Sequence, residues 1–359
     1  MCSVTHNADL TKLTTFGTPA GCGCLVEYRD FDDLRRLAAD EPGLLSGEVF
    51  CLGGGSNVLF LDEFYRGTVL RCVGESISEV KSGENGRARF VVQAGLPLDS
   101  LVGYAAGKGL WGLENLAAIP GRVGGAAVQN VGAYGAEFSQ SVVKVNGFDL
   151  DTLQSVSFSK EECAYGYRQS VFKTPGAPRI AIYEVEVELS RIRAPRLGYA
   201  GIREALRDVP EDEVTPAQIA EAVRKVRAAK LPDPAVVGSA GSYFKNPVVP
   251  AAVLPAIEES WEKFCTRQGA EHLSLQYHQG ADGAVKLSAA WMIDKAGCKG
   301  FAEGGASLWP TQPLVIVNRD GTATAGDVVA LQRRVQRRVE EAFGVLLIPE
   351  VVKLGDNQQ

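Results

Sequence analysis

The stretch from Ile119 to Gly135 most constrains what this chain can fold into, because glycine and alanine leave its main-chain amides bare beside polar side chains. It reads IPGRVGGAAVQNVGAYG. Glycine has no Cβ and tolerates positive φ, so successive N–H groups can converge on an anion at contact distance. The stretch therefore predicts main chain that lies against a large ligand carrying phosphates.

A second run, Gly53-Gly54-Gly55-Ser56-Asn57, follows directly after the apolar residues 49–52. This order predicts a strand that leads into a phosphate-binding loop. A tight turn explains a single glycine run equally well. Two such runs in one chain favour a dinucleotide as the ligand.

Composition sets the broad class of the protein. The chain has 359 residues, 45% of them hydrophobic and 22% charged, which is ordinary for a globular protein. Its length suits about two or three domains. The net charge of −6 argues against a nucleic-acid surface. Four arginines, Arg333, Arg334, Arg337 and Arg338, alternate with apolar residues at helical spacing, so they predict the solvated face of an amphipathic helix.

We expect a cytoplasmic protein without membrane contact, because no apolar stretch approaches the ~20 residues of a membrane span and the N-terminus lacks a signal peptide. The eight cysteines include no Cys-x-x-Cys pair and are expected to be reduced. The three histidines are too few to favour a Ser-His-Asp triad or a histidine-rich metal site, so no metal is predicted. Disorder is expected only in the first few residues, around His6, and in the tail 355–359.

Helices and strands alternate along the sequence. Hydrophobic periodicity predicts strands over 24–28, 49–52, 69–70, 88–92, 142–145, 180–187 and 314–317, and helices over 32–39, 97–109, 215–230, 251–264, 288–296 and 325–343. Thr215 and Gln218 have capping-box spacing, which indicates a helix start. The segment 345–352 is strongly β-prone and predicts one more strand.

Glu350 is the first candidate for proton chemistry. It is flanked by Leu347, Ile348, Val351 and Val352, and a carboxyl buried in such company remains protonated near neutral pH and can donate a proton. An exposed glutamate on an edge strand is the open alternative.

Ser242 and Arg168 are two further candidates. Ser242 lies in a glycine-containing loop with Lys245 and Asn246, where a cation beside a hydroxyl allows proton relay; a serine that only satisfies its own turn is the alternative. Arg168, flanked by Tyr167 and Phe172, can hold a carboxylate through its two-pronged donor geometry. A surface salt bridge is the simpler explanation for this arginine.

Seven short motifs occur in one order along the chain. They are Thr14–Gly17, Gly53–Asn57, Gly112–Leu116 continuing through Ile119–Gly121 to Asn130–Gly135, Tyr167-Arg168, Lys230–Pro234, Gly241–Pro247 and Pro349–Val351. In this order they resemble the UDP-N-acetylenolpyruvoylglucosamine reductase family, and the resemblance covers residues 11 to 352.

The resemblance implies an α+β chain with a two-subdomain FAD-binding fold of the vanillyl-alcohol-oxidase (PCMH) type and a C-terminal α+β substrate domain. Residues 1–72 are then the first FAD-binding subdomain, joined by a C-terminal strand over 344–355, and residues 73–230 are the second. Residues 231–343 are the substrate-binding domain. Tyr199 matches the loop tyrosine of the family's longer form.

The resemblance also implies the chemistry. NADPH reduces FAD, and UDP-N-acetylglucosamine enolpyruvate then receives a hydride from flavin N5 at C3 and a proton from Ser242 at C2. Arg168 and a protonated Glu350 stabilise the charge that develops. The chain is expected to act as a monomer on this small molecule. The implied FAD-binding residues are Gly53, Gly54, Gly55, Ser56, Asn57, Ile119, Pro120, Gly121, Gly124, Gly125, Gln129, Asn130, Gly132 and Ala133. The implied substrate-binding residues are Tyr167, Tyr199, Lys230, Lys245, Asn246 and Tyr277.

Three positions depart from the family pattern. Ala302 stands where a polar substrate contact is expected, Trp309 where a histidine is common, and Val352 where some relatives have a basic residue near the flavin. Two other classes of protein remain open. One is a flavin oxidase of the same fold acting on another alcohol or sugar, and the other is a non-catalytic nucleotide-binding module.

Overall fold

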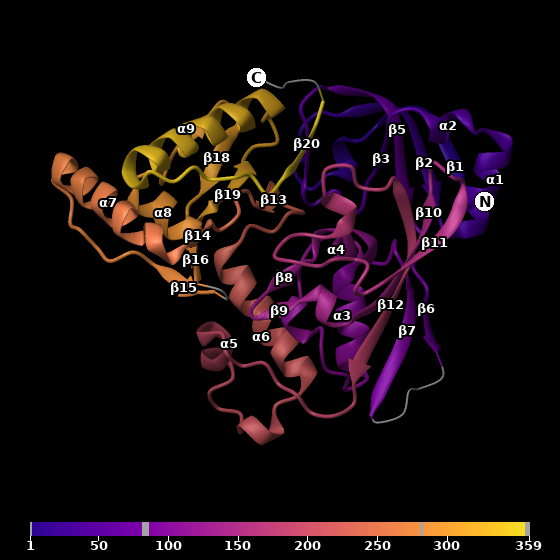
Figure 1. Cartoon of the computed structure of the whole chain (residues 1–359), viewed down its shortest axis with the longest axis horizontal. Coiled ribbons are helices and arrows are strands. Elements are labelled where there is room, and N and C mark those ends of the chain that lie inside the picture. Colours follow the sequence, from indigo (N-terminus) through magenta and orange to yellow (C-terminus); the bar gives the residue numbers. More distant parts are fainter. Residues whose placement is uncertain (1, 81–85, 281–282, 356–359) are drawn as a thin grey trace. The chain divides into compact units, whose positions relative to one another are not determined.

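The computed structural model describes residues 2–80, 86–280 and 283–355 (Figure 1). The chain divides into two compact units. The first unit contains the residues up to Asp9, Gly21–Gly54 and Phe64–Ala229. The second contains Leu10–Ala20, Gly55–Glu63 and the residues from Lys230 onward. Two short segments from the N-terminal part of the sequence thus belong to the C-terminal unit.

The first sheet of unit one has the strand order β1-β2-β5-β3. Its strands are β1 (Ser3–Asp9), β2 (Gly21–Tyr28), β3 (Val49–Cys51) and β5 (Phe64–Cys72). β1 is antiparallel to β2, whereas β2 and β3 both run parallel to β5. Helices α1 (Phe31–Asp40) and α2 (Gly43–Ser46) connect β2 to β3. The expected helix at 32–39 is confirmed, and the side chain of Asp30 caps it by accepting from the Asp33 amide.

The expectation of a disordered N-terminus is wrong. His6 lies within β1 and pairs in register with Cys24 of β2. The reason is that β2 offers a free edge on the side away from β5, and main-chain hydrogen bonds with that edge order the first residues. Residues 356–359 of the expected disordered tail lie outside the described part of the chain.

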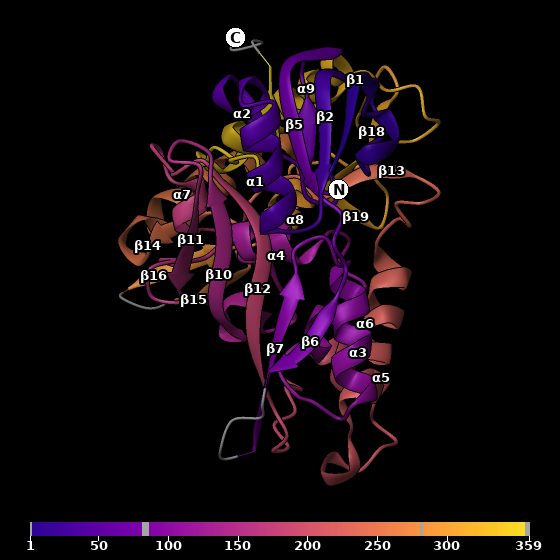
Figure 2. The ribbon, with the colours of Figure 1, turned by 90° about the vertical axis from the view of Figure 1, so that its right-hand side faces the viewer.

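The second sheet of unit one is antiparallel, with the order β11-β10-β12-β7-β6. The remaining strands of this unit are β6 (Ile77–Val80), β7 (Arg87–Gln93), β8 (Gly132–Ala133), β9 (Ala136–Glu137), β10 (Val142–Asp149), β11 (Gln154–Ser159) and β12 (Ile180–Ser190). Its other helices are α3 (Leu98–Gly107), α4 (Val123–Gln129), α5 (Ala200–Ala205) and α6 (Pro216–Lys230). α4 packs against β12 and β7. α3 and α6 lie side by side, joined by a 2.7 Å ion pair between Asp99 and Arg224 (Figure 2).

Unit two contains three sheets, β13-β19-β18-β17, β14-β16-β15 and β20-β4. Their strands are β4 (Val58–Phe60), β13 (Gly238–Ser242), β14 (Val248–Pro250), β15 (Tyr277–Gln279), β16 (Ala284–Leu287), β17 (Ala302–Glu303), β18 (Ala306–Trp309), β19 (Gln312–Asn318) and β20 (Val352–Leu354). The helices are α7 (Leu254–Gln268), α8 (Ala289–Lys295) and α9 (Ala325–Phe343). No helix in the described residues has the length and apolar character that crossing a membrane requires.

Helix α9 confirms the amphipathic helix expected at 325–343. A capping box of Thr324 and Asp327 starts it, and Gly344 ends it at a φ of 66°. Its buried face contains Val328, Leu331, Gln332, Val335, Val339, Ala342 and Phe343. Phe343 stacks on Trp261 of α7 with ring centroids 4.7 Å apart. Arg333, Arg334 and Arg337 are exposed, as expected for a solvated face. Arg338 departs from this expectation, because it is partly buried and donates to the Ala296 carbonyl at 2.9 Å.

The prediction of a strand over residues 345–352 is wrong for most of that range. Regular pairing begins only at Val352, where β20 runs parallel to β4. Upstream, Phe244 and Pro349 form a single bridge. Pro349 has no N–H and cannot donate to a strand ladder, so the segment changes partners at this point. Leu346 and Ile348 are about half exposed, at 51% and 53%, while Leu347 is fully buried.

Candidate active site

The two glycine runs meet in the first unit. A Cβ placed on Gly54 would lie 2.6 Å from the Cα of Gly121, and one on Gly53 would lie 3.4 Å from the Cα of Gly125. No side chain fits at the Gly54 contact, so the two loops form one surface of bare main chain. Their predicted contact with a phosphate-bearing ligand stays a prediction. Ile119 and Pro120, just before Gly121, are partly buried.

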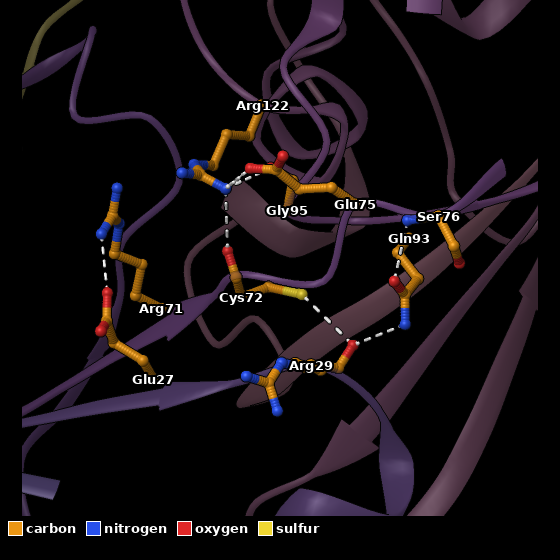
Figure 3. A network of polar contacts seen from close by, with 9 residues as sticks. All are labelled: Glu27, Arg29, Arg71, Cys72, Glu75, Ser76, Gln93, Gly95 and Arg122. Atoms are coloured by element: carbon orange, nitrogen blue, oxygen red, sulfur yellow. Dashed lines mark hydrogen bonds and ion pairs between the residues drawn. The ribbon is translucent and has the colours of Figure 1, made fainter. Parts of the chain in front are cut away.

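Arg122 holds the loop from Gly121 to α4 in place. Its Nη1 donates to the carbonyl oxygen of Gly95 and, at 3.4 Å, to that of Cys72, and it lies 3.2 Å from a Glu75 carboxylate oxygen (Figure 3). Burial, and then the nearby charge of Arg71, lower the pKa of the Arg122 guanidinium. These bonds connect the end of β5 and the turn after β7 to the start of α4. Sequence reasoning missed Arg122, because its partners are mostly main-chain carbonyls.

Asn130 closes the C-terminal end of α4 in the left-handed conformation, with a φ of 46°. Its side chain is fully buried: Nδ2 donates to a Glu137 carboxylate oxygen at 3.0 Å and to the Gly166 carbonyl at 2.8 Å, and Oδ1 accepts from the Ser139 amide at 3.1 Å. Gln129 beside it accepts a hydrogen bond from Lys173. Both side chains therefore anchor the loops around them, and their expected contact with a cofactor stays a prediction.

Arg168 lies in a strained main-chain conformation with a φ of 53°. Its guanidinium donates to the carbonyl oxygens of Gly132 at 2.5 Å and Asn130 at 3.4 Å, and it lies 5.3 Å from the centre of the Tyr167 ring. Lys173 Nζ donates to the Arg168 carbonyl oxygen at 3.3 Å. The structure thus brings Arg168 and Tyr167 together with Gly132 of β8 in the first unit.

Tyr199 packs on Tyr134, the residue after Ala133, edge to face with ring centroids 4.8 Å apart. Buried Asn115 supports this pair, because its Nδ2 donates to the carbonyl oxygens of Tyr134 at 2.9 Å and Arg196 at 3.0 Å. Tyr199 itself is 38% exposed, which leaves its ring available to a ligand.

Ser242 and Glu350 lie on neighbouring segments of the second unit. The Glu350 amide donates to the carbonyl oxygen of Tyr243 at 2.8 Å, and the Lys245 amide donates to that of Ile348 at 2.9 Å. Ser242 ends β13 and is exposed, whereas Glu350 is partly buried. Main-chain hydrogen bonds therefore pair the segments that carry the loop serine and the C-terminal acid predicted from the sequence.

The other residues predicted to bind substrate in this unit are Lys230, Lys245, Asn246 and Tyr277. Lys230 is exposed at the end of α6, and Tyr277 of β15 is 41% exposed. Asn246 Oδ1 accepts from the Ala289 amide at 3.0 Å, which leaves its Nδ2 for other partners. Gly55, Ser56 and Asn57 also belong to this unit.

Two family models match the chain. One, described as an FAD binding domain, matches residues 38–149, and the other, described as the C-terminal domain of UDP-N-acetylenolpyruvoylglucosamine reductase, matches residues 233–354. Among curated proteins, UDP-N-acetylenolpyruvoylglucosamine reductase of Chromobacterium violaceum is 40% identical over 96% of this chain and 97% of its own length. The chain belongs to the UDP-N-acetylenolpyruvoylglucosamine reductase family. The reductase of Burkholderia vietnamiensis is 41% identical over 98% of this chain and 97% of its own.

A solved structure agrees with this family assignment. The crystal structure of UDP-N-acetylenolpyruvylglucosamine reductase from Thermus caldophilus superimposes with a TM-score of 0.65, at 27% identity and 99% coverage of both chains. The predicted fold class, an FAD-binding part followed by a C-terminal α+β domain, is confirmed. As a member of this reductase family, the protein is an FAD-dependent oxidoreductase.

The residues present fit FAD. Both glycine runs lie within the matched range 38–149. At Gly54 there is no room for a Cβ beside the Cα of Gly121, so only glycine fits there. Bare amides of this kind suit a diphosphate. Gly53, Gly54, Gly121 and Gly125 of the first unit would hold it, and the bound FAD supplies hydride transfer.

The three departures from the reductase pattern have different surroundings. Ala302 of β17 is exposed. Trp309 of β18 has a buried Nε1 without a hydrogen-bond partner among the described residues. Val352, the first residue of β20, pairs with Val58 of β4 and is partly buried.

Proposed function

We propose that this chain reduces UDP-N-acetylglucosamine enolpyruvate to UDP-N-acetylmuramate with electrons from NADPH, as a cytoplasmic step of peptidoglycan precursor synthesis. The reduction adds a hydride to C3 of the enolpyruvyl double bond and a proton to C2. Hydride transfer from NADPH to the substrate is the chemistry that FAD would supply when held by Gly53, Gly54, Gly121 and Gly125. Negative charge develops at C2 and on the adjoining carboxylate, and side chains of this protein must stabilise that charge.

Ser242 is the proposed donor of the proton to C2, and Glu350 the proposed acid beside it. The observation that carries the proposal is the 2.8 Å hydrogen bond from the Glu350 amide to the carbonyl of Tyr243, the residue next to Ser242. A hydroxyl and a carboxyl on paired segments of one unit suit proton delivery followed by stabilisation of the enolic charge.

Arg168 is proposed to hold the substrate carboxylate. Carbonyl oxygens of Gly132 and Asn130 orient its guanidinium from one side, and a preorganised donor of this kind stabilises developing charge better than mobile water. Tyr167, Lys230, Lys245 and Asn246 are proposed to bind the anionic groups of the substrate. Tyr199 and Tyr277, each about 40% exposed, are proposed to cover the diphosphate of the substrate.

The test is a two-step anaerobic titration. NADPH is added to the purified holoenzyme until the flavin absorbance bleaches, and UDP-N-acetylglucosamine enolpyruvate is then added. We expect the yellow colour to return with formation of UDP-N-acetylmuramate. Ser242→Ala should still bleach with NADPH but recover colour on the order of 10²-fold more slowly, whereas the exposed Ser78→Ala control should match the wild type. Unchanged reoxidation of Ser242→Ala would refute its role.

A further inference from the structure

A set of hydrogen-bonded polar side chains lies next to the segments of Ser242 and Glu350 in the second unit. Gln332 is only 5% exposed, although it lies on the otherwise apolar face of α9. Tyr243, next to Ser242, is fully buried. Buried polar groups cost free energy unless they are hydrogen-bonded, so their partners indicate what they hold in place.

The Gln332 side chain connects two elements. Its Oε1 accepts from the Tyr243 hydroxyl at 3.0 Å and from Lys353 Nζ at 3.1 Å. Lys353 belongs to β20, three residues after Glu350. One amide oxygen of α9 thus accepts a hydrogen bond from each of the two segments that carry Ser242 and Glu350.

Gln336 continues this connection one helical turn along α9. It accepts from Gln332 Nε2 at 2.9 Å, and its own Nε2 donates to the Leu347 carbonyl oxygen at 2.7 Å. Leu347 is fully buried and lies on the segment that leads to Glu350. The two glutamines therefore reach three points, Tyr243, Leu347 and Lys353, of the two paired segments.

We propose that Gln332 and Gln336 form an amide clamp that positions Ser242 and Glu350 for the reaction, with Tyr243 and Lys353 as its contacts. The inference rests on the proposed function above. Neither glutamine is a catalytic residue, because they contact the Tyr243 hydroxyl, the Lys353 ammonium and the Leu347 carbonyl and reach Ser242 and Glu350 only through the chain between. Gln332 and Tyr243 are buried, Gln336 is half-buried and Lys353 is exposed. Because the buried amide and hydroxyl lose free energy unless they are paired, their hydrogen bonds favour one arrangement of the two segments, which restricts the distance between the hydroxyl and the carboxyl.

The test measures two half-reactions of the holoenzyme, reduction by NADPH and reoxidation by saturating UDP-N-acetylglucosamine enolpyruvate. We expect Gln332→Leu and Tyr243→Phe each to slow reoxidation about tenfold or more relative to reduction, because a misplacement of about 1 Å can cost up to 10²-fold. Tyr243→Phe keeps the buried ring, so this variant should still fold and test the clamp even if Gln332→Leu does not fold. Gln336→Leu should show a smaller effect in the same direction.

Tyr28→Phe is the matched control. It also removes a buried tyrosine hydroxyl, which donates to the Ile182 carbonyl at 2.8 Å in the first unit, so it should lower the Tm without changing the ratio of the two rates. If the clamp variants slow both half-reactions equally, or keep the wild-type ratio of the two rates, the clamp is refuted and the proposed function stands. If wild-type flavin is not reoxidised by this substrate, the proposed function itself fails and the clamp with it.

Discussion

The side-chain amide of Asn57 donates a 3.2 Å hydrogen bond to the main-chain carbonyl of Glu350. The Val352 amide returns the contact with a 3.0 Å bond to the Asn57 carbonyl. Both residues belong to the second unit. The last residue of the Gly53–Asn57 run is thereby hydrogen-bonded to the proposed acid, although they are 293 positions apart in the sequence.

Asn57→Ala should therefore impair the reaction more than the fold. Loss of one hydrogen bond lowers the free energy of unfolding by about 1 kcal/mol, whereas a displaced Glu350 slows substrate turnover about tenfold. Steady-state kinetics and urea unfolding measure the two effects. Asn146→Ala, which loses an exposed 2.8 Å bond from Ser157, is the control and should retain full turnover. Equal kcat values for both variants would contradict the inferred role of Asn57.

Gly54→Ala should weaken FAD binding. The added Cβ would lie 2.6 Å from the Cα of Gly121, so the two loops must move apart and the bare main-chain surface is lost. We expect a fall of at least tenfold in FAD affinity, measured by flavin fluorescence during reconstitution of the apoprotein. Gly103→Ala, inside α3 with no atom within 4 Å of the new Cβ, should bind FAD normally and gain up to about 1 kcal/mol of stability. Normal FAD content in Gly54→Ala would show that the loops need not touch.

The sequence predicted elements whose periodicity is local, and missed those that depend on distant packing. The amphipathic pattern of α9 was sufficient to predict the helix and its buried face, since Val328, Leu331 and Val335 are all buried. Helix α4 was missed because glycine and alanine form no amphipathic pattern and glycine disfavours helices. Packing decides its conformation instead: a Cβ on Gly124 would lie 2.9 Å from the Cβ of Ala94.

The same distinction applies to the candidate site. Ser242, Glu350 and Arg168 could be predicted as site residues because their motifs are contiguous in the sequence, and their roles stay a prediction. Gln332 lies in no such motif. Arg122 lies within the Ile119–Gly135 stretch, but sequence reasoning assigned it no role because its partners, Cys72, Glu75 and Gly95, are distant in the sequence and mostly main-chain atoms. Only one local signal could have indicated Gln332, an amide on the apolar face of an amphipathic helix.

The buried cysteines should resist alkylation in the native protein. Burial raises the pKa of the Cys22, Cys72 and Cys163 thiols to about 11 and that of Cys298 to about 12. At pH 8 about one thousandth of a thiol with a pKa of about 11 is the reactive thiolate, and about one ten-thousandth of the Cys298 thiol, so iodoacetamide should modify these four slowly and about tenfold faster with each added pH unit. Mass spectrometry of native and urea-treated samples measures this.

The same pKa shifts affect stability. Because the folded state holds these protons more tightly than the unfolded chain, their contribution to the free energy of unfolding is fully present below the unfolded pKa, near 9, and is lost as the pH rises through 11. Rapid modification of all four cysteines at pH 8 without denaturant would contradict their burial.

Arg168→Lys tests whether the guanidinium, rather than charge alone, holds the substrate carboxylate. Lysine keeps the positive charge but loses the planar pair of donors and the two bonds to the Gly132 and Asn130 carbonyls that orient it. We expect kcat/KM for the enolpyruvyl substrate to fall on the order of 10²-fold, which corresponds to a loss of about 2.7 kcal/mol of transition-state stabilisation. Arg191→Lys, in an exposed 3.0 Å ion pair with Glu79, is the control and should match the wild type. Should both variants keep wild-type kcat/KM, a point charge suffices at position 168 and the carboxylate is held elsewhere.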